Sequence, residues 1–250
     1  GGGGPNGMGR PDDNGNGTGG KPPAMPTSDD TGLTIETAAN RTTDSTDTTD
    51  NTSTSAKALK AGNEVNISGG EFKIDSADDS VHSNGNIVIT GGNISVASGD
   101  NGMHADGNLT ISDGTVDITK SYEGIEGSIV TIDGGTISVV ASDDGINCAG
   151  GSDTGSTDRM GADQFSSQDG VELNINGGTV TIDADGDGLD SNGNFTMAGG
   201  TVYVCGPTNG GNGALDYNGT ATVTGGTLIA CGAVGMEEGF GDSSTQYSVL

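Results

Sequence analysis

The sequence predicts an all-β protein that folds as a right-handed parallel β-helix, with three-strand coils of about 22 residues. Three observations support this prediction: a short repeat, alternating apolar positions within each copy, and a glycine-rich composition without tryptophan. A period this short means that one repeat cannot bury its own apolar face, so each repeat must stack on its neighbours. Parallel crossovers are right-handed in about 98% of cases, which sets the expected hand.

A glycine that ends a Gly-Gly or Asp-Gly pair marks each copy of the repeat. The steps between successive copies are 22, 22, 21, 43, 22 and 26 residues. The 43-residue step leaves about 21 extra residues, near 150–170, which we expect to loop out between the second and third strands of one coil. The 26-residue step inserts about four residues within 206–211. The marking glycines are Gly70, Gly92, Gly114, Gly135, Gly178, Gly200 and Gly226.

Each copy carries three short runs in which apolar and polar residues alternate. In one copy the runs hold Ile94/Val96, Met103 and Leu109/Ile111. Period-two alternation places these side chains inside the coil and their polar neighbours outside. The chain is 30% apolar, and most of these residues are small or β-branched, which suits a thin core built from strands.

The chain divides into two parts by composition. Residues 1–56 are rich in Gly, Pro, Asn, Asp, Ser and Thr, which predicts a low-complexity loop or linker in which only Leu33 to Ile35 is strand-like. Residues 57–250 hold the repeat and form the predicted β-helix domain. The chain begins without Met and ends in what reads as a strand cut in mid-course, so we expect an interior piece, truncated at both ends, of a longer protein.

The charge of the chain narrows the function classes. Against 35 acidic residues stand 8 basic ones, a net charge of −27, so a nucleic-acid backbone would be repelled. No apolar run approaches the ~20 residues of a membrane span. Such acidity indicates either a solvated surface or bound cations, and the placement of the carboxylates decides between them.

The acidic residues recur in fixed columns of the repeat. Coils stack about 4.8 Å apart, so residues of one column become near neighbours. Two carboxylates at that separation repel by about 3 to 4 kcal/mol at an effective dielectric constant of 20, and a hard cation removes this repulsion. Because oxygen ligands from Asp, Glu and Asn suit Ca²⁺, the sequence predicts a calcium site, with a salt-screened acidic edge as the alternative. The predicted ligands are Asp79, Asp100, Glu123, Glu126, Asp143, Asp144, Asn147, Asp187, Asp190 and Asp216, and the best site lies across Glu123, Glu126, Asp144, Asn147, Asp187 and Asp190.

Two histidines and one lysine lie close to the acidic columns. His82 and His104 share one column on adjacent coils, and we expect them on the outer surface, paired with Asp106 or Glu126 or bound to a ligand. Lys120 is the basic residue inside an acidic turn. Its role as charge compensation or as a proton-abstracting base stays open.

Cysteine and tyrosine also occur at positions of interest. Cys205 and Cys231 share a column in adjacent coils, close enough for a disulfide, although two free thiols fit equally well. Tyr122, Tyr203 and Tyr217 are the aromatic residues expected near the outer face, with an inward Tyr217 as an alternative. Sugar rings stack on flat aromatic surfaces, so these three are candidates for contact with a glycan.

Four stretches resemble a bacterial family of carbohydrate-binding parallel β-helix proteins, whose coils are similar to those of pectate-type polysaccharide lyases. They are IDSADDSVHSNG (74–85), KSYEGIEG (120–127), ASDDGIN (141–147) and GPTNGGNGALDYNG (206–219), and the resemblance extends over about 57–250. It implies a right-handed helix, Ca²⁺ ions, an extracellular or cell-surface setting, and binding to cellulose or acidic sugars. It places 1–56 as a surface loop between coils and implies no catalytic residue, since the family is known as binders.

We therefore predict a monomeric, noncatalytic, Ca²⁺-dependent polysaccharide-binding domain for cellulose, acidic (uronate) glycans, or both. One alternative is a polysaccharide lyase, in which Ca²⁺ acidifies the proton next to a uronate carboxyl group and Lys120 removes it. The other is a cell-surface rod or adhesin that Ca²⁺ only stiffens.

Overall fold

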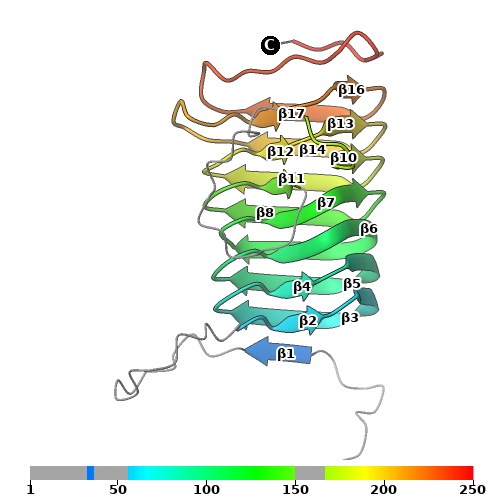
Figure 1. Cartoon of the computed structure of the whole chain (residues 1–250), viewed down its shortest axis with the longest axis vertical. Coiled ribbons are helices and arrows are strands. Elements are labelled where there is room, and N and C mark those ends of the chain that lie inside the picture. The colour runs from blue at the N-terminus through cyan, green and yellow to red at the C-terminus, as the bar shows by residue number, and fades with distance from the viewer. Residues whose placement is uncertain (1–32, 37–55, 150–166, 250) are drawn as a thin grey trace, which may run out of the picture. The chain divides into compact units, whose positions relative to one another are not determined.

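The structure, a computed structural model, describes residues 33–36 by their backbone, and residues 56–149 and 167–249 in full. Over these residues it contains strands and no helix, and every pairing between strands is parallel. Figure 1 shows the strands stacked coil upon coil from β2 and β3 (cyan) to β16 and β17 (orange). The predicted parallel β-helix with a repeat of about 22 residues is confirmed. The described residues include no helix of the length and apolarity that crossing a membrane requires.

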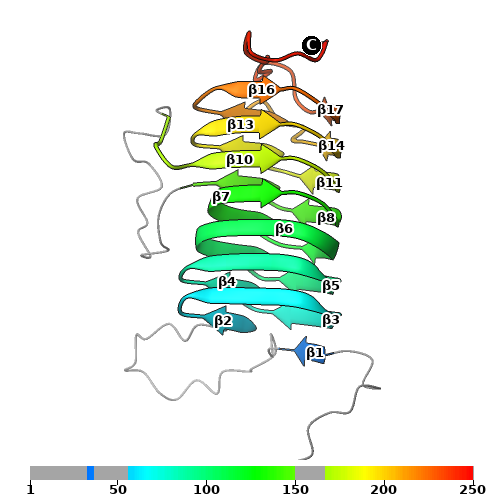
Figure 2. The same ribbon diagram turned by 90° about the vertical axis from the view of Figure 1, so that its right-hand side faces the viewer.

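Each coil holds three strands. In the N-terminal coils some of them merge into one long strand, as in β3, β5 and β6, because the third run of one copy continues into the first run of the next. Figure 2 shows β7, β10, β13 and β16, which carry third runs, stacked along one side. The strands are β1 (Leu33–Glu36), β2 (Leu59–Ala61), β3 (Glu64–Ser76), β4 (Val81–Ser83), β5 (Asn86–Ser98), β6 (Met103–Lys120), β7 (Ile125–Ile132), β8 (Thr136–Ala141), β9 (Ile146–Cys148), β10 (Glu172–Ile175), β11 (Thr179–Ala184), β12 (Leu189–Ser191), β13 (Asn194–Met197), β14 (Thr201–Cys205), β15 (Leu215–Tyr217), β16 (Ala221–Val223) and β17 (Thr227–Cys231).

The pairing register reproduces the columns predicted from the sequence. Val81 lies opposite Met103, which lies opposite Ile125, and the same column continues through Ile146 to Leu189. All five side chains are buried. Residues about 22 positions apart are therefore direct neighbours, and the core is a set of aliphatic columns that run along the stack.

The glycines that mark the repeat have a conformational reason to be glycine. All seven, from Gly70 to Gly226, have φ between 80° and 102°, in the left-handed region that side chains disfavour. Each allows the chain to turn from the third run of one coil into the first run of the next. The spacing of these residues therefore reports the coil length directly.

The two long steps fall where the sequence predicts them. After β9, a second strand, the chain reaches β10, which pairs with the third-run segment of β7, so the insertion lies between second and third strands. Most of the inserted segment, 150–166, is outside the described residues. The shorter insertion lies between β14 and β15.

The strand-like character of Leu33 to Ile35 is confirmed in β1, which pairs with β3 through Leu33 opposite Phe72. The rest of the predicted linker, 1–56, lies outside the described residues apart from Ala56. The division of the chain into 1–56 and 57–250 stays a prediction.

Candidate functional site

Six of the ten predicted ligands lie in the turns that precede the short second strands, and the other four lie on these strands. In three of these turns a carboxylate accepts a hydrogen bond from a backbone N–H of the next coil. Asp144 Oδ1 accepts from Asp187 N at 2.7 Å, Asp79 Oδ1 accepts from Asn101 N at 3.2 Å, and Asp187 Oδ1 accepts from Gly213 N. At these three places the acids of this column link one coil to the next.

Three carboxylates converge where two neighbouring coils meet. Asp144 comes from the turn between β8 and β9, Asp187 from the turn before β12, and Asp190 from β12 itself. Each offers one oxygen, and these oxygens lie within 4.8 Å of one another. All three side chains are half-buried, and we name them the Asp144 cluster.

Burial and mutual repulsion perturb this cluster strongly. Burial, followed by the nearby carboxylates, raises the pKa of Asp190 to about 9 and that of Asp144 to about 8. Burial also raises the pKa of Asp187 to about 6, although the hydrogen bond from Gly213 opposes the rise. Without a cation, Asp144 and Asp190 therefore retain protons at neutral pH, and a divalent cation would allow them to ionise.

The residues around the Asp144 cluster fit a hard cation. Asn147 lies opposite Asp190 in the pairing register, and its Oδ1 is buried with no hydrogen-bond partner among the described residues. Its Nδ2 donates to Glu123 Oε1 at 3.3 Å, so the carbonyl oxygen is the atom left to take a ligand. Carboxylate and amide oxygens without nitrogen or sulfur match Ca²⁺, and Asp144, Asn147, Asp187 and Asp190 are the residues that would hold it.

Three other predicted ligands surround the cluster. Asp216 lies opposite Asp190 in register, and its charge helps to raise the pKa of Asp190. Glu123 and Asp143 both raise the pKa of Asp144. The structure thus gathers seven of the ten predicted ligands in one region.

The three remaining predicted ligands, Asp79, Asp100 and Glu126, lie nearer the N-terminal end of the stack. Asp79 and Asp100 group with Asp78, each offering one oxygen within 4.8 Å of the others. Glu126 approaches His104, with Oε2 at 3.4 Å from Nδ1, and accepts a hydrogen bond from Asn101. Glu126 belongs to the predicted site across Glu123 to Asp190, but its carboxylate contacts His104 and Asn101.

The expectation that both histidines lie on the outer surface is wrong. His82 is 3% exposed and His104 is 1% exposed. Asp79, which is fully buried, lies against His82 with Oδ2 at 2.9 Å from Nδ1, and the two imidazole centroids are 5.0 Å apart. The alternation pattern correctly predicted that the histidine side chains point away from the apolar core. They are nevertheless buried, because Asp79, Asp106 and Glu126 lie against them.

A lysine from the preceding coil completes this buried group. Lys57 Nζ donates to both Asp79 Oδ2 and Asp78 Oδ1, the latter at 3.2 Å. Burial alone would raise the pKa of Asp79, but the hydrogen bonds from His82 and Lys57 lower it below its usual value. Asp79 is therefore ionised at neutral pH, in contrast to Asp144 and Asp190.

Cys205, Cys231 and Lys120 lie on the outer surface, whereas Cys148 is buried in the core. Cys205 lies opposite Cys231 in register, as predicted, and both are free thiols. Cys231 Sγ donates to the Val204 carbonyl oxygen at 3.4 Å. Lys120 ends β6 with an exposed side chain.

Of the three candidate tyrosines, Tyr203 presents the most open ring. It is 44% exposed and lies opposite Ile229, which is 55% exposed. Tyr217 is half-buried against the core and donates its hydroxyl to the Gly239 carbonyl oxygen. Tyr122 is also half-buried.

The sheet that carries Tyr203 also has a column of threonines, which is not among the predicted site residues. One threonine follows the marking glycine in five successive copies, and these residues pair in register. Four of the five are exposed and one is half-buried. The Gly-Thr pair that recurs in these copies is the sequence pattern from which the column could have been predicted. The column is Thr115, Thr136, Thr179, Thr201 and Thr227, and we call this surface of β6, β8, β11, β14 and β17 the threonine face.

Comparison with protein families gives one match that covers most of the chain. A family model described as "Carbohydrate-binding domain-containing protein" matches residues 24–102 and 103–210. Searches of curated proteins and of solved structures gave no match. The matched residues include the Asp144 cluster, the buried histidines and Tyr203. Because the match extends over well more than half of the sequence, the chain belongs to the family of carbohydrate-binding domain-containing proteins.

Proposed function

We propose that the chain is a noncatalytic, Ca²⁺-dependent polysaccharide-binding domain for cellulose, acidic (uronate) glycans, or both. It would act as a monomer, outside the cell or at its surface. The observation that carries the calcium dependence is the Asp144 cluster, in which three carboxylates from two coils lie within 4.8 Å of one another. Membership in the carbohydrate-binding family supports a carbohydrate as the ligand.

Calcium has two consequences for binding. It would allow Asp144 and Asp190 to ionise at neutral pH and would bridge the two coils that carry them, and so it would fix the outer faces of the solenoid in register. It also supplies positive charge to a chain with a net charge of −27, which would otherwise repel a polyuronate. Acidic glycans should therefore depend on Ca²⁺ more strongly than neutral ones.

A neutral glycan fits the threonine face. Its paired columns present hydroxyl groups from Thr179 and Thr201 beside the exposed ring of Tyr203. Sugar rings offer hydroxyl groups at their edges and apolar C–H surfaces on their faces, which suit threonine hydroxyls and an aromatic ring respectively. The regular spacing of the coils repeats these contacts along the stack.

The test is a pull-down on insoluble cellulose and on an immobilised polyuronate, with Ca²⁺ and with excess chelator. We expect the chelator to release the protein from polyuronate and to weaken its retention on cellulose. Retention that is unchanged by chelator on both materials would contradict the calcium dependence. Incubation with soluble polyuronate should give no unsaturated product, and such a product would support the lyase alternative.

Tyr203→Ala tests the threonine face separately. Loss of an aromatic contact worth about 0.5 to 1.5 kcal/mol should weaken cellulose binding roughly two- to tenfold, with little change in Ca²⁺ affinity. Tyr247→Ala is the matched control, because Tyr247 is also exposed but belongs to no strand. Equal cellulose binding by both variants and the unmodified chain would exclude this face.

A further inference from the structure

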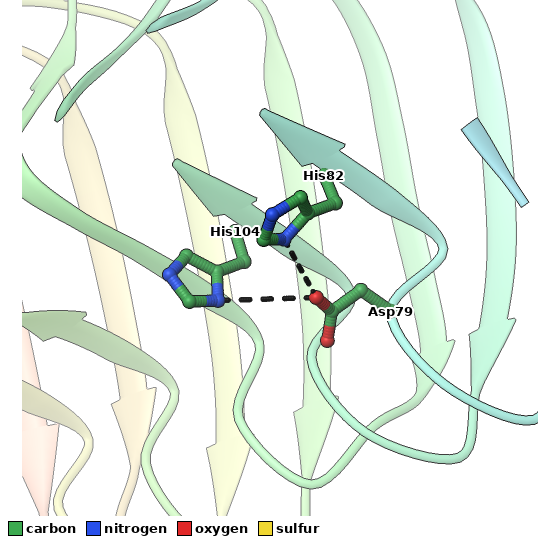
Figure 3. Close-up of side chains that lie close together, drawn as sticks. All are labelled: Asp79, His82 and His104. Carbon is green, nitrogen blue, oxygen red and sulfur yellow. Dashed lines mark hydrogen bonds and ion pairs between the residues drawn. The ribbon is translucent and has the colours of Figure 1, made fainter. Parts of the chain in front are cut away.

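A second polar group lies apart from the Asp144 cluster, within the coils that contain β4 and β6. Asp79, His82 and His104 are each at least 97% buried, and the chain has no other histidine. Figure 3 shows both imidazole rings turned toward one carboxylate oxygen of Asp79. The pairing register is responsible, because His82 lies opposite His104 on adjacent strands.

The atoms of this group have the spacing of a metal-ligand set. Asp79 Oδ2 lies 2.9 Å from His82 Nδ1 and 3.8 Å from His104 Nδ1. A fourth atom, Glu126 Oε2, lies 3.4 Å from His104 Nδ1. Ligand atoms bound at 2.0–2.1 Å in a tetrahedral zinc site are about 3.3 Å apart, which is close to these separations.

The surroundings of His104 favour the ring form that a metal requires. Asp106 Oδ1 lies 3.4 Å from His104 Nε2, on the side of the ring away from Asp79. A carboxylate there favours the proton on Nε2 and leaves the lone pair of Nδ1 directed at the cluster. Metal-bound histidines commonly have such a carboxylate on their second nitrogen.

A cation already contacts the cluster in the structure, namely the ammonium group of Lys57. It donates to Asp79 Oδ2, the same oxygen that both histidines face. Lys57 also contacts Asp78 Oδ1 at 3.2 Å, so it retains an ion pair if a metal takes its place on Asp79. Lys57 is therefore a competitor whose removal should strengthen metal binding.

We propose that Asp79, His82 and His104, with Glu126 as a fourth ligand, bind one transition-metal ion of the Zn²⁺ class. Two imidazole nitrogens distinguish this site from the oxygen-only Asp144 cluster, because imidazole suits Zn²⁺, Co²⁺ and Ni²⁺ and does not suit Ca²⁺. The site joins three consecutive coils through β4, β6 and β7. It does not depend on the proposed carbohydrate binding.

The experiment titrates the metal-stripped chain with Zn²⁺ by calorimetry and with Co²⁺ by visible absorption, in saturating Ca²⁺. A Cys205→Ser/Cys231→Ser background removes the two exposed thiols as ligands. We expect one equivalent to bind, with the visible bands of tetrahedral Co²⁺. His82→Gln and His104→Gln should each weaken Zn²⁺ binding at least tenfold, Lys57→Met should strengthen it, and Glu71→Gln, an exposed site on β3, should leave it unchanged.

Two outcomes would overturn the proposal. One is that neither Zn²⁺ nor Co²⁺ binds to the Cys205→Ser/Cys231→Ser chain. The other is that this chain still binds Zn²⁺ when it also carries both His82→Gln and His104→Gln. Thermal melts by circular dichroism show whether the histidine variants fold. If they do not, X-ray absorption at the zinc edge of the background chain decides instead, since two imidazole ligands support the site and their absence excludes it.

Discussion

Asp190→Asn is expected to stabilise the metal-free protein at pH 8 and to remove most of its stabilisation by Ca²⁺. The reason is that Asp190 lies among Asp144, Asp187 and Asp216, where burial and their charges raise its pKa to about 9. Asparagine keeps the size of the side chain and has no charge to bury. The same exchange removes a negative ligand from the proposed calcium site.

The sign of the pH effect follows from proton binding. The carboxyl group of Asp190 has a pKa near 3.8 in the unfolded chain and about 9 in the folded one. Between these values the folded state holds more protons than the unfolded state, so metal-free stability should fall as the pH rises from about 4 to about 9. Asp144, with a folded pKa of about 8, contributes in the same direction. Asp190→Asn should therefore flatten this decline.

Melting temperatures from pH 5 to 9, in chelator and in Ca²⁺, measure both effects. Ca²⁺ at 100 times its Kd should add about 2.7 kcal/mol to the unmodified chain, or about 5 to 11 °C. In Asp190→Asn that shift should fall to a small fraction. Asp117→Asn, outside the Asp144 cluster, is the charge-matched control. A variant that is less stable in chelator at pH 8, yet keeps the full Ca²⁺ shift, would show that Asp190 has a purely structural role.

Gly145→Ala is expected to destabilise the solenoid at any pH and any Ca²⁺ concentration. A Cβ atom at this position would lie 2.3 Å from Ile182 Cγ2 and 2.5 Å from the Gly188 carbonyl oxygen. Both neighbours belong to the next coil, where Ile182 is buried in the core and Gly188 N–H is bonded to Gly213 O. Because neither can move freely, the cost should reach the upper end of the about 1–3 kcal/mol typical of overpacking, or about 6 to 12 °C in Tm.

Gly69→Ala is the control for this substitution, because a Cβ atom there meets nothing within 4 Å and the residue has no positive φ. We expect its melting temperature to lie within about 2 °C of the unmodified chain. Similar losses in Gly145→Ala and Gly69→Ala would show that the cost arises from glycine content and not from contact between coils.

The sequence was sufficient for the architecture because a solenoid repeats one local solution. Alternation placed Met103 and Ile125 inside, and the marking glycine, at Gly92 for example, set the coil length. It was also sufficient to align the acidic columns, since register follows once the coil length is known. The Asp144 cluster draws its members from these columns: Asp144, Asp187 and Asp190.

What the tertiary structure alone decided is how each polar side chain is surrounded. The sequence places His82 and Asp190 in the same column, yet His82 is buried against Asp79, which also accepts from Lys57, while Asp190 lies among carboxylates. The difference arises because exposure and pKa depend on the side chains of adjacent coils and on the direction of each rotamer. Periodicity specifies neither, so it predicted the column and missed the burial of the histidines.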